Sequence, residues 1–212
     1  MNIYKELQEK LSEHEPTEVD ELILDDLFEN VSAFSEQNKK DLERYKNLVH
    51  LSLNGFGLES LKNFPKIPTL QILEIRQNKL TGSDFSHIHE LYPELYKLKV
   101  GENPIKSVDV FKPLANSKIE KVELQETPAA EHTDYKKTLF ATIKTLRAVD
   151  SLNKDGEEEN STVYEDDEGE EYSEDDDAEF DENDDEMDEF DDEEGDDESG
   201  SDKPAPKKTG KK

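Results

Sequence analysis

Apolar residues recur along the first 150 residues with a fixed spacing that is clearest between Leu70 and Leu80, LQILEIRQNKL. Apolar side chains stand at positions 70, 73, 75 and 80 of this stretch, and Asn78 stands between the last two. This is the leucine-rich repeat pattern L-x-x-L-x-L-x-x-N-x-L. Leu73 and Ile75 alternate, which places them on one face of a short strand. The amide of Asn78 suits the turn that follows, because it can hydrogen-bond backbone groups there.

The same frame begins at residues 19, 48, 70, 95 and 119, so that the steps between repeats are 29, 22, 25 and 24 residues. These steps lie within the period of leucine-rich repeats. Further apolar residues recur between the strands, where helical or 3₁₀ turns are expected to close each coil: Leu61, Phe64 and Ile67; Phe85, Ile88 and Leu91; Val108, Phe111 and Leu114. The pattern predicts an α/β fold, a right-handed leucine-rich repeat solenoid with a parallel concave sheet.

The long first step contains a polar, helix-prone insert at residues 31–46. We expect an irregular first repeat in which Phe34, Leu42 and Tyr45 pack into the core. Before it, residues 2–15 have a helical apolar stripe that Pro16 ends. A helix in this place commonly covers the open end of a repeat core, and we predict an N-terminal cap.

The other end of the array is expected to close with a C-terminal repeat cap. Thr133 is predicted to cap a helix, and residues 146–150 are predicted to form a last short strand. The apolar residues of this helix are Tyr135, Leu139, Phe140, Ile143 and Leu146. The folded domain is therefore expected to span residues 1–154.

Charge divides the chain into three parts. Residues 1–154 hold 26 acidic and 21 basic residues, residues 155–202 hold 30 acidic and no basic residues, and residues 203–212 hold five lysines, which together give the net charge of −30. Like charges at the density of the second part repel, and its few apolar residues cannot offset the loss of chain entropy on folding. We expect a disordered acidic tail at 155–202 and a basic C-terminal end at 203–212.

Several classes of protein are disfavoured by the sequence. There is no cysteine, which excludes disulfides and thiolate metal sites. We see no signal-peptide pattern at the N-terminus and no apolar run of the roughly 20 residues that a membrane span needs. We expect a soluble protein that has no membrane partner.

The pieces taken together resemble the acidic leucine-rich nuclear phosphoprotein 32 family. The most specific matches are ELILDD at residues 21–26, LQILEIRQNKLTG at 70–82 and TDYKKTLFATIKTLRAVD at 133–150. The last segment also resembles the cap of a spliceosomal relative, which lacks an acidic tail. The chain departs from the family in its short tail, in Ala129-Ala130 before the cap, and in a lysine-rich rather than bipartite terminal signal.

The resemblance implies a nuclear protein that shuttles to the cytoplasm, binds and chaperones histones, and masks histone acetylation sites. It also implies inhibition of protein phosphatase 2A, adapter roles with RNA-binding export factors, and phosphorylation by kinases that read acidic residues. We expect a monomer.

No catalytic constellation is apparent in the sequence, and we predict no enzyme activity, cofactor or resident metal. The phosphate-binding and nucleophile motifs G-x-x-x-x-G-K-[ST], G-x-G-x-x-G and G-x-S-x-G are absent. The histidines, at positions 14, 50, 87, 89 and 132, are expected to be solvated surface residues. An EF-hand-like start at Asp181 lacks the turn glycine and the final glutamate of a calcium loop.

The tail is polyanionic and should attract dense lysine and arginine surfaces while repelling DNA and RNA. Core histones are the expected partner, and no direct nucleic-acid binding is predicted. Aromatic rings inside the acidic runs are candidate anchors, the alternative being that they are incidental; Asp188 and Glu189 precede the ring at position 190. These aromatic residues are Tyr164, Tyr172, Phe180 and Phe190. Ser173 and Thr162, which precede acidic residues, are candidate phosphorylation sites.

The concave sheet is the second candidate site, because residues between the core positions of each strand face outward. The outward set near the first two strands includes Glu21, Ile23, Asp25, Ser52 and Asn54. The residues selected as protein-binding are His50, Glu74, Arg76, Lys97, Lys99, Lys121 and Glu123. The lysines among them are also candidates to hold the protein's own tail, and a plain solvated face is the alternative.

We conclude from the sequence that the protein is a non-enzymatic nuclear adapter and histone chaperone, in which the tail binds core histones and the repeat domain docks protein partners. The alternative is an inhibitor of protein phosphatase 2A that acts through the repeat domain.

Overall fold

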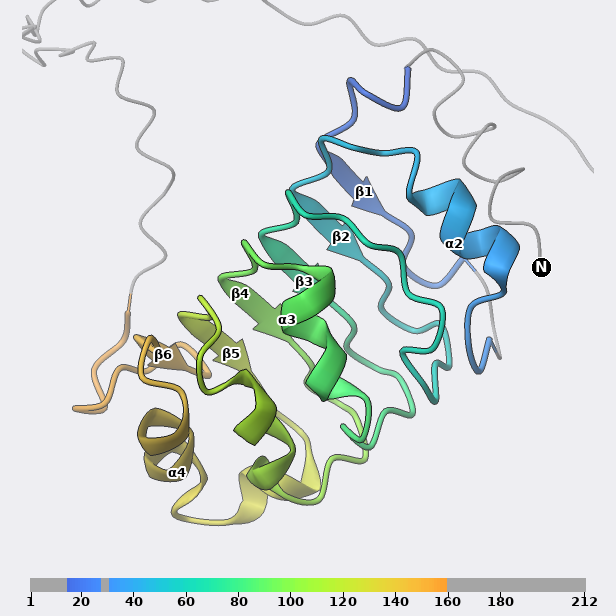
Figure 1. Ribbon diagram of the computed structural model, residues 1–212. Coiled ribbons are helices and arrows are strands. Elements are labelled where there is room, and N and C mark those ends of the chain that lie inside the picture. The colour runs from blue at the N-terminus through green and yellow to red at the C-terminus, as the bar shows by residue number, and fades with distance from the viewer. Residues whose placement is uncertain (1–14, 28–30, 160–212) are drawn as a thin grey trace, which may run out of the picture. The chain divides into compact units, whose positions relative to one another are not determined.

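The computed structural model describes residues 15–27 and 31–159. Six short strands form one parallel sheet in sequence order: β1 (Glu21–Ile23), β2 (His50–Ser52), β3 (Ile72–Glu74), β4 (Lys97–Lys99), β5 (Lys121–Glu123) and β6 (Ala148–Val149). Between the strands the chain returns through helical turns (Figure 1): α2 (Glu36–Leu42), η1 (Phe85–His87), α3 (Ile88–Leu91), η2 (Val108–Leu114), η3 (Pro128–Glu131) and α4 (Tyr135–Thr142). The predicted leucine-rich repeat solenoid is confirmed.

The register of the sheet follows the repeat frame. Leu22 pairs laterally with Leu51, Leu51 with Leu73, and so on through Leu98 and Val122 to Val149. These residues are all at most 3% exposed. The core lies between them and the return segments, where Phe34 stacks on Phe64 at 4.9 Å and Phe85 packs against Phe111 at 5.3 Å.

Asparagines fix the turns after the third and fourth strands, as the sequence predicts for Asn78. Asn78 Oδ1 accepts a hydrogen bond from the Leu58 amide, and its Nδ2 donates to the carbonyls of Leu53 and Arg76. Asn103 repeats the arrangement one coil later, with Leu80 as donor and three backbone carbonyls as acceptors. Each amide thereby joins its own coil to the preceding one.

The irregular first repeat is confirmed. Phe34, Leu42 and Tyr45 are all at most 7% exposed. The insert forms α2, which Ser35 begins with a reciprocal capping box: Ser35 Oγ accepts from the Asn38 amide, and Asn38 Oδ1 accepts from the Ser35 amide. The predicted N-terminal cap at residues 2–15 falls almost wholly outside the described residues.

Two local expectations are wrong. The return segment of the second repeat is buried at Leu61, Phe64 and Ile67, but it forms isolated turns in place of a helical or 3₁₀ segment. This repeat is the shortest, and Pro65 and Pro68 interrupt it. Thr133 does not cap α4. Asp134 occupies the N-cap position in a near-helical conformation, without a side-chain hydrogen bond.

The closing segment continues beyond the expected boundary at residue 154. After β6 the chain forms antiparallel bridges from Val149 to Leu152 and from Leu152 to Glu158. The Glu159 amide donates to the Ser151 carbonyl at 2.8 Å. The ordered cap thus includes the first residues of the acidic segment.

Candidate functional site

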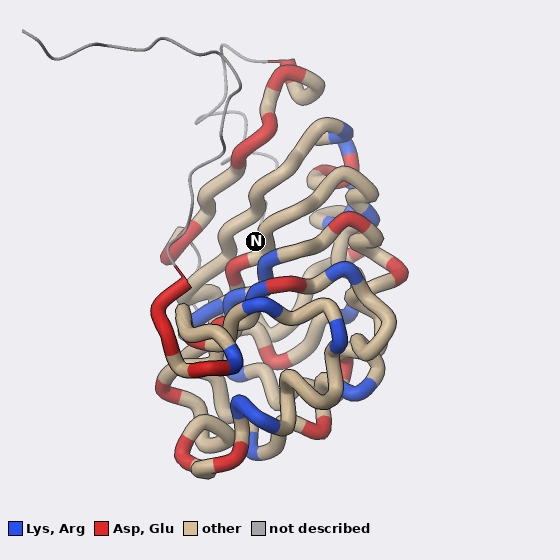
Figure 2. Tube along the Cα trace, turned by 90° about the vertical axis from the view of Figure 1, so that its left-hand side faces the viewer, with Lys and Arg blue, Asp and Glu red and all other residues tan. Residues whose placement is uncertain are grey.

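The concave face presents two rows of side chains that run across the strands. One row contains Glu21, His50, Ile72, Lys97 and Lys121, and the next contains Ile23, Ser52, Glu74, Lys99 and Glu123. Figure 2 marks acidic and basic positions along the trace, where both signs alternate through the middle of the domain. The rows exist because the parallel register repeats the same frame positions on every strand.

His50 lies between two carboxylates. Its Nδ1 is 2.7 Å from Glu21 Oε1, and its Nε2 is 3.0 Å from Glu74 Oε1. Carboxylates only accept, so both ring nitrogens donate when both bonds are made, and the ring is then an imidazolium. The hydrogen bond with Glu74 raises the pKa of His50; burial opposes this, and the hydrogen bond with Glu21 adds to it. The expectation of a freely solvated histidine is wrong at this position, whereas His87, His89 and His132 are exposed.

Glu74 is shared by two cations. Lys99 Nζ lies 2.9 Å from the same Oε1 atom that meets His50. Burial by itself raises the pKa of Glu74, but the hydrogen bonds from His50 and Lys99 outweigh it and lower the pKa to about 2. The carboxylate of Glu74 therefore joins β2, β3 and β4 at one point.

The other predicted residues of this face are also brought together. Lys97 Nζ lies 3.2 Å from Glu123 Oε1, and Arg76 Nη2 lies 3.1 Å from Glu102 Oε1. Lys121 has no ion pair with any residue in the described part of the chain. Most charge on the concave face is thus balanced by neighbours within the face.

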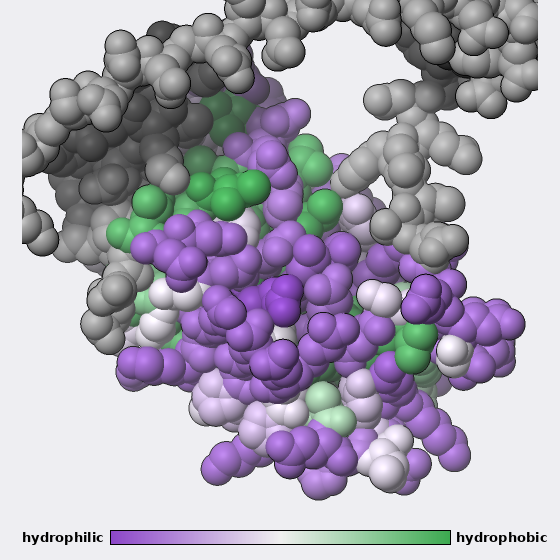
Figure 3. Space-filling model, turned by 180° about the vertical axis from the view of Figure 1, so that it is seen from behind, coloured by the Kyte–Doolittle hydropathy of each residue, from purple (hydrophilic) through white to green (hydrophobic). Residues whose placement is uncertain are grey.

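The polar character of the domain is also visible over a wider surface. Figure 3 shows the side that is turned away from the viewer in Figure 1, where hydrophilic side chains cover most of the middle of the domain. Apolar side chains gather mainly toward the upper part of this view.

Ser52 is placed differently from the prediction. It is 2% exposed, and its hydroxyl donates to Asp25 Oδ1 at 2.6 Å. Asn54 donates to the same carboxylate through its backbone amide and through Nδ2. These residues form a closed polar cluster that links β1 to β2 rather than presenting free groups to a partner. Beside it, Ile23 is 50% exposed.

Arg147 and Glu159 were missed by sequence reasoning. Arg147 Nε lies 3.2 Å from Glu159 Oε1, while Glu159 Oε2 is buried without a hydrogen-bond partner among the described residues. Glu159 lines a hollow of about 150 Å³ together with Lys97 and Lys121. Arg147 follows the cap helix in sequence, but nothing in the repeat frame indicates that the acidic segment turns back to meet it.

Within residues 15–27 and 31–159, no group of three or more histidine, aspartate or glutamate side chains is placed to hold a metal ion. The helices of the same residues are all too short to cross a membrane. The predicted tail sites and both predicted phosphorylation sites lie outside the described residues: Tyr164, Tyr172, Phe180, Asp188, Glu189, Phe190, Thr162 and Ser173.

Comparison with known proteins identifies relatives of the repeat domain. An acidic leucine-rich nuclear phosphoprotein 32-related protein of Plasmodium falciparum is 33% identical over 164 residues, which cover 74% of this chain and 58% of that protein. A related protein of rice, Oryza sativa subsp. japonica, is 34% identical over 117 residues, which cover 55% of this chain and 25% of that protein. A histone of Tetrahymena thermophila is 27% identical over 124 residues, which cover 58% of this chain and 32% of that protein. This chain therefore spans less than two thirds of each of these relatives.

No family model matches the chain. Among solved structures, the Drosophila melanogaster SNF/U2A′ complex contains a chain that matches with a TM-score of 0.52 at 21% identity, covering 63% of this chain and 73% of that chain. At this identity the match supports the leucine-rich repeat fold alone. The curated relatives bear out the resemblance drawn from the sequence: the chain is a leucine-rich repeat protein similar to several proteins named acidic leucine-rich nuclear phosphoprotein 32 or 32-related.

Proposed function

We propose that the protein is a non-enzymatic nuclear adapter and histone chaperone. Its acidic segment binds core histones, and the concave face of its repeat domain docks protein partners. The proposal rests on a difference in charge balance between the concave face of the repeat domain and the acidic segment. The concave face balances its charges internally, whereas residues 155–202 hold 30 acidic residues and no basic residue.

Attraction of a polycation requires charge that is not already neutralised. On the concave face, His50, Arg76, Lys97 and Lys99 each lie within 3.2 Å of a carboxylate oxygen. The acidic segment has no such compensation in its own sequence, and its field acts over a screening length of about 8 Å at physiological salt. The acidic segment therefore supplies the attraction, and the repeat domain supplies shape and selectivity.

The names of the relatives support the nuclear setting. Several are called acidic leucine-rich nuclear phosphoproteins, and one protein with a similar stretch is a histone. Return to the cytoplasm, and adapter contacts with RNA-binding export factors, are part of the proposal as well. Live-cell imaging of a fluorescent fusion, with and without inhibition of nuclear export, tests the shuttling.

The test of histone binding compares the full chain with a fragment of residues 1–159, which retains the whole described core. We expect the full chain to bind core histone dimers or tetramers with an affinity that falls steeply as salt rises, and the fragment to lose nearly all of this binding. Equal binding of the two proteins at physiological salt would overturn the role of the acidic segment.

The aromatic anchors are tested within the full chain. Replacement of Phe180 and Phe190 by alanine leaves the charge unchanged, so a loss of affinity for histone dimers reports on the rings alone. Unchanged affinity would rule the anchors out. The alternative function, inhibition of protein phosphatase 2A through the repeat domain, predicts that the 1–159 fragment inhibits as well as the full chain does.

A further inference from the structure

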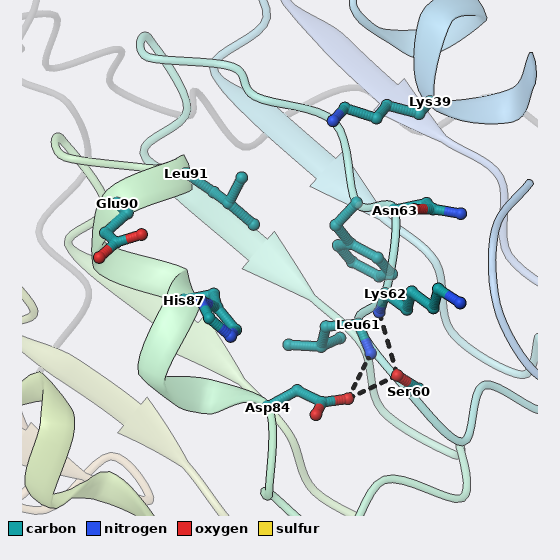
Figure 4. Close-up of a pocket in the computed structure, with 10 residues that line it drawn as sticks. Lys39, Ser60, Leu61, Lys62, Asn63, Asp84, His87, Glu90 and Leu91 are labelled. Carbon is teal, nitrogen blue, oxygen red and sulfur yellow. Dashed lines mark hydrogen bonds between the residues drawn. The ribbon is translucent and has the colours of Figure 1, made fainter. Parts of the chain in front are cut away.

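A groove lies on the face of the domain opposite the sheet, where the second repeat lacks a helix. The first repeat carries α2 and the third carries α3, but the return segment of the second repeat runs between them as turns. Figure 4 shows α3 on one side of the resulting hollow and the 60–64 segment, with Lys39 above it, on the other. The hollow has a volume of about 470 Å³.

The groove is held open by hydrogen bonds between coils. Asp84 Oδ2 accepts from the Ser60 hydroxyl at 2.6 Å and from the Leu61 amide at 3.0 Å. On the other side, Asn63 Nδ2 donates to the Phe34 carbonyl at 3.0 Å. These bonds tie the short return segment to both neighbouring coils, so that the groove exists before any partner arrives.

The floor of the groove is apolar and its walls carry opposite charges. Its apolar lining residues are Leu61 and Phe64, which are at most 5% exposed, and the partly buried Leu91. Lys39 projects over it from α2, and Glu90 stands on α3 across from it (Figure 4). Neither charged side chain has an ion pair with another residue of the described chain.

We propose that this groove docks an amphipathic helix of a partner protein, with an apolar stripe on the floor, acidic residues along the α2 side and basic residues along the α3 side. Such a helix takes the place of the one that the second repeat lacks. The charges decide against the protein's own acidic segment as the occupant, because Glu90 and Asp84 lie among the lining residues with Lys39 and Lys62. The surface is separate from the concave face, so the inference goes beyond the proposed function.

Three synthetic helical peptides test the proposal on the full chain. All share one leucine stripe at positions i, i+3, i+4 and i+7. The mixed peptide has glutamate on one flank of the stripe and lysine on the other, the all-lysine peptide has lysine on both flanks, and the all-glutamate peptide has glutamate on both. We expect the mixed peptide to bind most tightly and to shift the methyl NMR signals of Leu61 and Leu91. If no peptide shifts these signals at millimolar concentration, or if the shifts fall on other parts of the domain, the groove is not a docking site.

Charge reversal of the walls provides the specific control. Lys39→Glu places an acidic residue on α2 as well as on α3 and should move the preference toward the all-lysine peptide, whereas Glu90→Lys should move it toward the all-glutamate peptide, each by up to about fivefold. Lys106→Glu makes the same change at an exposed lysine of the fourth repeat and should leave the preference as it is. The proposal is overturned if Lys39→Glu and Lys106→Glu behave alike.

Discussion

Single side chains hold the concave face together by bonds that cross from strand to strand, and His50 is the clearest case. Its ring spans Glu21 on β1 and Glu74 on β3, and Glu74 reaches on to Lys99 on β4. The side chains of His50 and Glu74 are 19% and 14% exposed, so solvent screens this contact less than it does an ordinary surface ion pair. These contacts therefore predict that the stability of the repeat domain depends on pH.

The sign follows from the two pKa shifts. The pKa of His50 is raised from 6.5, so its contribution is complete below pH 6.5 and is lost as the pH rises through the higher value in the folded state. The pKa of Glu74 is lowered from 4.5 to about 2, so its contribution is complete above pH 4.5 and is lost as the pH falls toward 2. Both contributions are present between about pH 4.5 and 6.5.

We predict that His50→Gln costs roughly 1.5–3 kcal/mol of unfolding free energy at pH 5.5, the range for hydrogen bonds to charged groups, and clearly less at pH 9. Urea denaturation at the two pH values measures the difference. His132→Gln is the control, because His132 is exposed and should show little effect at either pH. An equal loss for His50→Gln at both pH values would contradict the imidazolium bridge.

Two tyrosines give a second prediction at this scale. The Tyr92 hydroxyl is buried and has no hydrogen-bond partner in the described chain, whereas the Tyr135 hydroxyl donates to Asp150 Oδ2 at 2.6 Å. Burial raises the pKa of both phenols, and Asp150 adds to the effect at Tyr135.

Tyr92→Phe should be neutral or stabilising, because it removes a donor that makes no bond. Tyr135→Phe should cost about 1 kcal/mol or more, because it leaves the buried carboxylate of Asp150 with one bond fewer. Thermal unfolding of the two variants decides, and a larger loss for Tyr92→Phe would show that its hydroxyl has a partner.

At the scale of elements, the coils are joined by their turns as much as by their strands. The amide of Asn103 is buried and makes all its hydrogen bonds to backbone groups, among them the Leu80 amide and the Ile75 carbonyl of the preceding coil. In the fifth repeat Thr127 stands at the same frame position and bonds only within its own coil. The asparagine turns are therefore the stronger link between coils.

We predict that Asn103→Ala destabilises the domain by roughly 2–4 kcal/mol, because it strands several buried backbone groups without a partner. Asn116→Ala, at an exposed asparagine of the same repeat, should change stability by less than about 0.5 kcal/mol. Chemical denaturation of both variants makes the comparison. Similar losses for the two would mean that water replaces the Asn103 amide.

Elements that depend on burial could be predicted from the sequence, and elements that depend on local bonding could not. The frame from Val19 to Leu124 predicted the centres of β1 to β5, because only apolar side chains fit between sheet and return segments. The same frame placed Glu21 and His50 side by side, although the diagonal contact from His50 to Glu74 also depends on sheet twist and rotamer. The wrong predictions were the N-cap residue of α4 and the helical segment after Leu61, because a few hydrogen bonds and two prolines determine the local structure there.

At the scale of the whole chain, the excess negative charge is concentrated in residues 155–202 and not in the repeat domain. Residues 1–154 carry nearly balanced charge, and most ionic groups on the concave face have a partner there. The 30 acidic residues of 155–202 were expected to lie wholly outside the fold. The cap shows that the first of them take part in it, since residues 157–159 bond back to residues 151–153. Sequence reasoning missed this because acidic composition says nothing of a few backbone hydrogen bonds.

The position of the domain boundary can therefore be tested by measuring the stability of fragments that end at different residues. We predict that a 1–159 fragment unfolds at nearly the same denaturant concentration as the full chain, and that a 1–154 fragment is less stable by roughly 1–3 kcal/mol. The shorter fragment loses the hydrogen bonds from the Asn153 amide to Glu157 and from the Glu159 amide to Ser151, each worth about 0.5–1.5 kcal/mol. Arg147→Gln in the 1–159 fragment removes the ion pairs of Arg147 with Glu159 and Glu120 but keeps these backbone bonds. It should cost less than about 1 kcal/mol, because Arg147 is largely exposed. If the two fragments are equally stable, the segment 155–159 does not close the cap, and the domain ends where the repeat pattern placed it.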